Sequence, residues 1–189
     1  MRDPMEYAWW LASRASGIVA LVLIALSVAI GLVMAAKAVR KPGVPRILIA
    51  VHEHAALAAL VAIAVHGITL LGDHWLDPGI LGITVPFVID HEPVFTGLGI
   101  IGGYLAAILG LTFYLRRRIG NRRWRNAHRL TPLVYVLGVI HTLGSGSDAG
   151  TAWMTAILIA TGAPILYFGI MRALPATPVS ARAARAESG

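Results

Sequence analysis

The sequence predicts an all-α membrane protein: a five-transmembrane-helix bundle with the N-terminus outside and the C-terminus cytoplasmic. Three observations predict this fold class. Of the 189 residues, 57% are hydrophobic and 13% are charged, and the mean hydropathy is +0.74. A chain of this composition has more apolar surface than a soluble core of its size would bury. Five apolar stretches are long enough to cross a bilayer. The connections between these stretches alternate between basic and acidic residues.

The first two spans lie on either side of a basic connection. The first covers residues 8–36 and begins beside Tyr7, Trp9 and Trp10, an aromatic cluster typical of a membrane interface. Residues 37–46 contain four positive charges and helix-breaking prolines and a glycine. The second span is then Ile47–Gly72.

The third span, Val94–Leu115, follows the longest connection, residues 73–92. The apolar middle of that connection, Gly79–Ile89, is too short and too broken to cross, so we expect it on the membrane surface. Within the third span, Gly99 and Gly103 form a small-residue pair, which favours close helix packing over contact with a flat ligand.

The last two spans follow a segment with seven arginines, Arg116–Arg129. The fourth begins near Trp124–His128 and ends around Leu143, and the fifth is Thr151–Met171 with a kink expected at Pro164. We therefore expect a membrane domain over residues 1–171. Residues 172–189 have the composition of a disordered cytoplasmic tail.

Loop charges predict the orientation and the location. The first connection has four positive charges, the third has seven, and the tail adds three more, whereas the second has four negative charges and the fourth only Asp148. Five spans with the N-terminus outside place every basic segment in the cytoplasm. The sequence thus predicts a multi-pass protein of the plasma membrane. The net charge of +7 is explained by these loops, so nucleic acid is not expected as a partner.

Four histidines are the main candidate site residues. His52 and His66 lie 14 residues apart in the second span, and His128 and His141 lie 13 apart in the fourth, about 20 Å of helical rise in each case. Both spans run outward, so His52 should pair with His128 near the cytoplasm, and His66 with His141 near the outside. Neutral imidazole is a good axial ligand for haem iron, and two stacked haems would carry electrons across the membrane.

Helical rotation fits one pair of positions better than the other. At about 100° per residue, fourteen residues rotate around the helix axis to about 40° short of four full turns, so His52 and His66 share a helix face. Thirteen end about 140° short, so an unbroken helix would point His128 and His141 in nearly opposite directions. Pro132 could kink the helix, or His128 could occupy an irregular first turn. His54, at 12 residues from His66, is a weaker alternative to His52.

Two other classes of protein remain open at this point. Buried histidines also serve haem-free membrane transporters or proton relays, and a structural or assembly subunit would need none of the four. The lack of cysteine excludes disulfides, iron–sulfur clusters and thiolate haem ligation within this chain.

The sequence resembles the ferric reductase-like transmembrane domain. This family includes ferric reductases, NADPH oxidases and the bacterial haem subunit that supplies a periplasmic methionine sulfoxide reductase. The resemblance extends from about Tyr7 to Met171, and the segments and residues that carry it are Arg14–Gly17, His52, His66, Trp124–Leu130 and His141. It implies two b-type haems (heme b) bound by the four histidines as metal ligands, and a role as a component of an oxidoreductase.

The resemblance also implies partners, and here the sequence departs from part of the family. Members that use NADPH directly have a flavin and nucleotide-binding domain after the last span, and this sequence has no Rossmann-type glycine-rich loop. We therefore expect a separate cytoplasmic flavoprotein reductase or membrane quinol as donor. The acceptor could be ferric iron, a quinone or a periplasmic acceptor protein. The five expected spans are one fewer than the six usual in much of the family, which have a further helix before the position of Tyr7.

Further charged residues are candidates for the cofactor. Arg14 lies near the expected depth of the outer haem, where it would pair with a propionate or extend to the interface. Arg125 and Arg129 flank His128 and could bind inner propionates, anionic lipid or a flavoprotein. The acidic and histidine residues of connection 73–92 could hold a cation such as ferric iron, although a solvated acidic loop is favoured.

Overall fold

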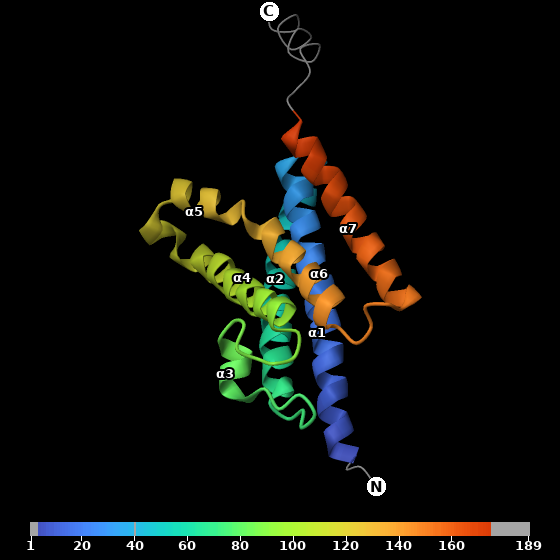
Figure 1. Cartoon of the computed structure of the whole chain (residues 1–189). Coiled ribbons are helices and arrows are strands. Elements are labelled where there is room, and N and C mark those ends of the chain that lie inside the picture. Colours follow the sequence, from blue (N-terminus) through green and yellow to red (C-terminus); the bar gives the residue numbers. More distant parts are fainter. Residues whose placement is uncertain (1–3, 40, 175–189) are drawn as a thin grey trace, which may run out of the picture.

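The computed structural model describes residues 4–39 and 41–174, which form seven helices and no strand (Figure 1). All the helices except α3 and α5 have 15 residues or more. The helices are α1 (Pro4–Ala35), α2 (Val44–Leu70), α3 (Gly79–Thr84), α4 (Pro93–Ile119), α5 (Asn121–His128), α6 (Thr131–Ser145) and α7 (Ala152–Ala173).

Glycine, proline and left-handed residues mark the ends of the helices. Gly43 has a φ of 83° directly before α2, a conformation that favours glycine, and Pro45 lies in the first turn of that helix. Pro93 opens α4 after the left-handed Glu92, and Gly120 closes it with a φ of 90°. These residues place the short connections where the basic and acidic segments were expected.

The predicted fourth span is wrong as a single helix. The chain breaks between α5 and α6, where the Leu130 N–H donates to the Ala127 carbonyl over 2.9 Å in a tight turn. Pro132, which has no N–H, lies in the first turn of α6. With 15 residues α6 is about 22 Å long, less than the roughly 30 Å thickness of the hydrocarbon core.

Four helices in the described part of the chain are long and apolar enough to cross a membrane: Tyr7–Ala35, Val44–Leu70, Pro93–Ile119 and Ala152–Ala173. The chain is therefore a multi-pass membrane protein. The count of five spans is not confirmed, and the orientation of the termini stays a prediction. The predicted tail begins inside α7, which continues to Ala173, and residues 175–189 lie outside the described residues.

The helices pack as two close pairs. α1 lies along α2, and α4 lies along α6, whereas α2 and α4 touch only weakly. α1 also contacts α6 and α7, and these three helices form the buried core, with Leu21, Ala25, Val28, Leu32, Tyr135 and Ile165 at its centre. This arrangement leaves α2 facing α5 and α6 across a gap rather than packed on them.

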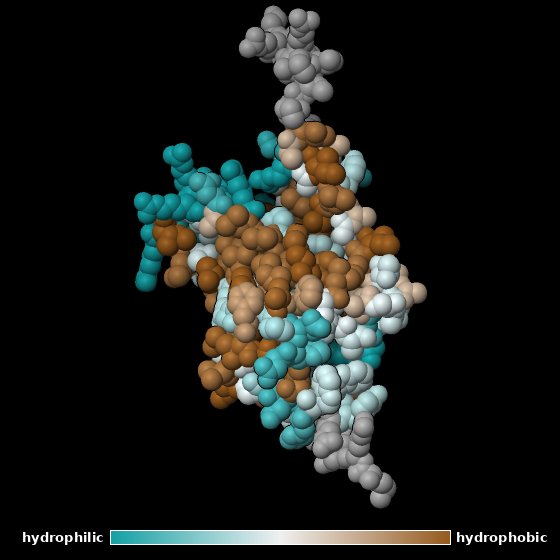
Figure 2. Space-filling model, in the orientation of Figure 1, coloured by the Kyte–Doolittle hydropathy of each residue, from teal (hydrophilic) through white to brown (hydrophobic). Residues whose placement is uncertain are grey.

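Polar residues gather at both ends of an apolar belt (Figure 2). The arginine-rich α5 lies at one end, and the connection that contains α3 lies at the other (Figure 1). α1 begins at the end of the molecule where α3 lies, and α7 ends at the opposite end, where α5 lies (Figure 1). Many large apolar side chains of α2 and α4 point outward and are exposed, as expected of helices that face lipid.

Candidate functional site

The four candidate histidines form two pairs across the gap. The ring centres of His52 and His128 are 6.0 Å apart with an angle of 87° between the ring planes. Those of His66 and His141 are 6.2 Å apart at 73°. The structure thus has the pairs that were expected from their depth in the membrane, with α2 supplying one histidine to each.

Hydrogen bonds fix the orientation of three of these imidazoles. The Nδ1 atoms of His52, His66 and His141 lie 2.8, 2.8 and 3.0 Å from the backbone carbonyl oxygens of Ser27, Ser13 and Phe95. A carbonyl oxygen only accepts, so in a neutral imidazole Nδ1 holds the proton and Nε2 keeps its lone pair. A metal-binding histidine commonly uses its second nitrogen in this way.

His128 is held differently. It is the last residue of α5, and its ring stacks on the indole of Trp124, with 5.0 Å between ring centres and 26° between planes. Within the described residues its Nδ1 is buried without a hydrogen-bond partner, as is Nε1 of Trp124. The helix break after His128 removes the rotational conflict with His141, because the two residues do not belong to one continuous helix.

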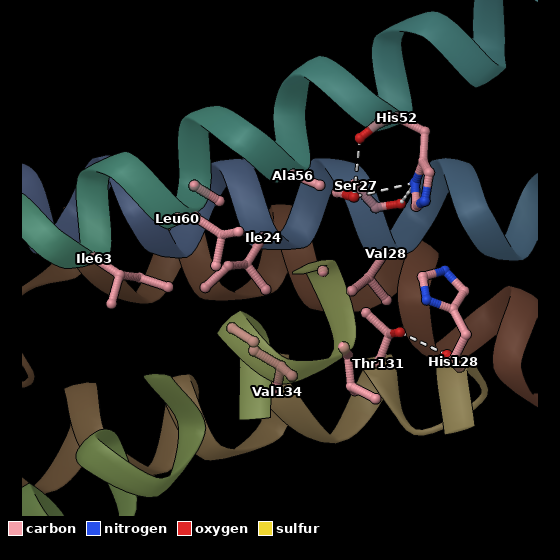
Figure 3. Close-up of a pocket in the computed structure, with 14 residues that line it drawn as sticks. Ile24, Ser27, Val28, His52, Ala56, Leu60, Ile63, His128, Thr131 and Val134 are labelled. Carbon is pink, nitrogen blue, oxygen red and sulfur yellow. Dashed lines mark hydrogen bonds between the residues drawn. The ribbon is translucent and has the colours of Figure 1, made fainter. Parts of the chain in front are cut away.

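An apolar pocket extends from the inner pair along α2 (Figure 3). Its lining comes from α1, α2, α4, α5 and α6, and includes Ile24, Val28, Leu60, Ile63, Leu109 and Val134. Its cavity volume is about 60 Å³, below the range of small-molecule pockets, so a ligand between the helices would require the lining side chains to move apart. The side chains of His52 and His128 point toward one another at one end of it (Figure 3).

The donor set and its spacing fit an axial pair on a haem iron. An imidazole nitrogen binds a divalent transition metal at about 2.0–2.1 Å, and the ring centre lies about 1.1 Å further back. Two imidazoles on opposite sides of one metal therefore have ring centres about 6.3 Å apart, close to the distances in both pairs. Each pair offers two imidazoles, the number of protein ligands that a bis-histidine haem takes. In the described residues no group of three or more His, Cys, Asp or Glu could hold a metal ion.

Arg14 has a partner that the sequence analysis did not predict. Its guanidinium donates from Nε and Nη2 to the two carboxylate oxygens of Asp148, each over 2.5 Å. Asp148 is buried, and the guanidinium also lies near the rings of Trp10 and Trp153. The residues are 134 positions apart, so the contact depends on how α1 packs beside the connection before α7.

The remaining candidates lie outside the pairs. His54 is exposed, and its Nδ1 bonds the Ala50 carbonyl of its own helix at 2.7 Å. Arg125 and Arg129 are exposed and make no ion pair with other described residues. The residues of connection 73–92 do not converge on a cation site, and buried Asp73 instead accepts from the N–H groups of Trp75 and Leu76.

Sequence reasoning missed the backbone acceptors on α1. The signal that could have revealed them is a repeat, because a serine followed four residues later by a glycine occurs at Ser13 and Gly17 and again at Ser27 and Gly31. The two copies are 14 residues apart, the same spacing as His52 and His66.

Comparison with known proteins gave one family match. The family described as "Ferric reductase like transmembrane component" matches residues 16–139. This range contains His52, His66 and His128 and ends two residues before His141. No curated protein and no solved structure matches the chain.

Proposed function

The chain belongs to the ferric reductase-like transmembrane component family, and from that premise we propose that it is a di-haem b-type electron-transfer subunit. In this proposal it passes electrons from a cytoplasmic donor to an acceptor on the outer face. The coarser conclusion, a membrane electron-transfer component, rests on the family. The number of haems, the partners and the direction are the proposal.

The observation that carries the proposal is the pairing of the four histidines. The ring centres lie 6.0 and 6.2 Å apart in the two pairs, and the Nδ1 atoms of His52, His66 and His141 are bonded to carbonyls, so in the neutral form Nε2 of each keeps its lone pair. Fourteen residues of α2 separate the two levels, a rise of about 21 Å. Two carriers stacked at this distance would connect the two sides of the membrane.

The roles of the residues follow from this arrangement. A haem b bound by each pair would supply a one-electron carrier. His52 and His128 would hold one of them near the basic end, and His66 and His141 the other near the acidic end. Because two histidines would hold each haem, the group would supply electron transfer rather than chemistry on a bound substrate. The apolar lining of the pocket would lower the polarity around the inner site.

The donor and the acceptor are proposed by chemical class. The arginines of α5 and of the last turn of α4 would face the cytoplasm by the positive-inside rule. They suit the acidic face of a flavoprotein, and membrane quinol is the other donor. The acceptor at the outer end would be ferric iron, a quinone or a periplasmic reductase.

Absorption spectroscopy of the purified protein tests the proposal. We expect a Soret band, a sharp reduced α band and a haem-to-chain ratio near two. Replacing His66 or His141 with alanine should remove one haem, and replacing His52 or His128 the other. A haem-free proton relay needs no chromophore, so a colourless, folded protein from haem-replete cells would contradict the proposal.

A further inference from the structure

We infer that two glycines, Gly17 and Gly99, are positioning residues that open a backbone carbonyl to the haem-ligating histidines His66 and His141; Gly31 has the same register relative to the acceptor of His52, but without a close contact. The inference rests on the proposed function and deepens it. In each case the carbonyl oxygen that accepts the imidazole Nδ1–H belongs to the residue four positions before the glycine. The pairs are Ser13 and Gly17, Ser27 and Gly31, and Phe95 and Gly99.

The spacing of four has a physical reason. In an α-helix the carbonyl of residue i accepts the N–H of residue i+4 and keeps a second lone pair. The Cβ of residue i+4 points back toward the N-terminus of the helix and lies over that same carbonyl. A glycine at i+4 removes this cover, so a side chain from a neighbouring helix reaches the oxygen.

The structure supports this at Gly17 and Gly99. A Cβ built on Gly17 would lie 3.1 Å from Nδ1 of His66, and one on Gly31 3.4 Å from Cε1 of His52. A Cβ on Gly99 would lie 2.6 Å from Nδ1 of His141, a distance at which the ring has to move. The imidazoles of His66 and His141 therefore occupy space that a side chain at Gly17 or Gly99 would need, whereas a Cβ at Gly31 would make only ordinary van der Waals contact with His52.

A packing role alone does not account for the pattern. Other glycines of the same bundle lie against rings or aliphatic side chains that make no hydrogen bond to the carbonyl four residues earlier: Gly72, Gly97 and Gly144 against Trp9, Phe87 and Phe95, and Gly103 and Gly110 against Ile63 and Leu60. The three glycines that meet a candidate imidazole are the ones placed four residues after its acceptor. The hydrogen bond makes the imidazole a more basic ligand, so its loss should raise the midpoint potential of the haem.

The test compares four alanine variants of the full chain, purified from haem-replete membranes. Gly67→Ala is the matched control, because Gly67 lies next to His66 and a Cβ added to it would meet nothing within 4 Å. The readouts are the haem-to-chain ratio, the two midpoint potentials from a redox titration, and the electron paramagnetic resonance signals of the low-spin ferric haems.

The expected effects are graded by the distances. Gly99→Ala should lose the outer haem. Gly17→Ala should keep both haems but weaken ferric relative to ferrous binding at the outer site about tenfold, which raises that potential by about 59 mV. Gly31→Ala, in ordinary van der Waals contact, should behave like Gly67→Ala and leave both potentials unchanged.

The inference is overturned if the Gly17→Ala and Gly99→Ala proteins match Gly67→Ala in haem content, potentials and ferric signals. It is also overturned if Gly67→Ala shifts the outer potential as much as Gly17→Ala does. Should Gly99→Ala fail to fold, the contrast between Gly17→Ala and Gly67→Ala decides alone. A colourless wild-type protein would overturn the proposed function as well, whereas a two-haem wild type with unmoved glycine variants overturns only this inference.

Discussion

The ion pair between Arg14 and Asp148 should contribute measurably to the free energy of unfolding. Replacing Asp148 with asparagine keeps the shape of the side chain but removes its charge and one of the two strong acceptors. The side chain of Asp148 is 8% exposed and that of Arg14 is 32% exposed. The pair therefore lies between an exposed bridge, which contributes about 0–1 kcal/mol, and a buried one, whose disruption costs about 3–5 kcal/mol.

From these limits we expect Asp148→Asn to lower the free energy of unfolding by about 2 kcal/mol. For a chain of this size that corresponds to a fall in Tm of roughly 4–8 °C, measurable by thermal unfolding in detergent. Arg14→Gln should cost more, about 3 kcal/mol, because it leaves the buried carboxylate without its countercharge.

The double variant separates an ion pair from two independent effects. If the residues interact as the structure has them, the combined loss should fall short of the sum of the single losses by about 1 kcal/mol or more. Additive losses within about 0.5 kcal/mol, or two single variants that both unfold like wild type, would refute the reasoning. A role for Arg14 with a haem propionate predicts instead that Arg14→Gln shifts the outer potential and Asp148→Asn does not.

Two further predictions concern neighbouring residues. Tyr135→Phe removes the 2.8 Å hydrogen bond from α6 to Thr161 on α7, so it should cost about 1 kcal/mol of stability, while Tyr167→Phe, an exposed control, should cost nothing measurable. His54→Ala should retain both haems in the absorption spectrum, because this exposed imidazole bonds its own helix; loss of the inner haem would make His54 the ligand in place of His52.

The apolar helices were predictable because their signal is local. The expected spans Ile47–Gly72 and Thr151–Met171 correspond closely to α2 and α7. The structure extends α4 to Ile119, past the expected end at Leu115, because backbone hydrogen bonding continues into the arginines while hydropathy does not. Location in the membrane follows from the same signal.

The pairing of the histidines was predictable because depth depends only on helical rise. The contact between Arg14 and Asp148 was not, since it joins residues 134 positions apart and needs the placement of α1 against the connection before α7. The carbonyl acceptors were also missed, because a backbone oxygen leaves no mark on composition. Only the glycine four residues later carries that information.

The helix break between α5 and α6 explains why His128 and His141 do not point in opposite directions. It also explains why His128, unlike the other three histidines, has no carbonyl partner. A continuous helix would turn His128 away from the face of His141. Ending α5 at His128 frees its direction, so that it meets His52 across the gap. No neighbouring glycine exposes a carbonyl to His128 at this helix end. Trp124, one turn earlier, sets the plane of the imidazole ring by stacking instead. The outer pair is thus anchored by two carbonyls and the inner pair by one, with an indole in place of the second.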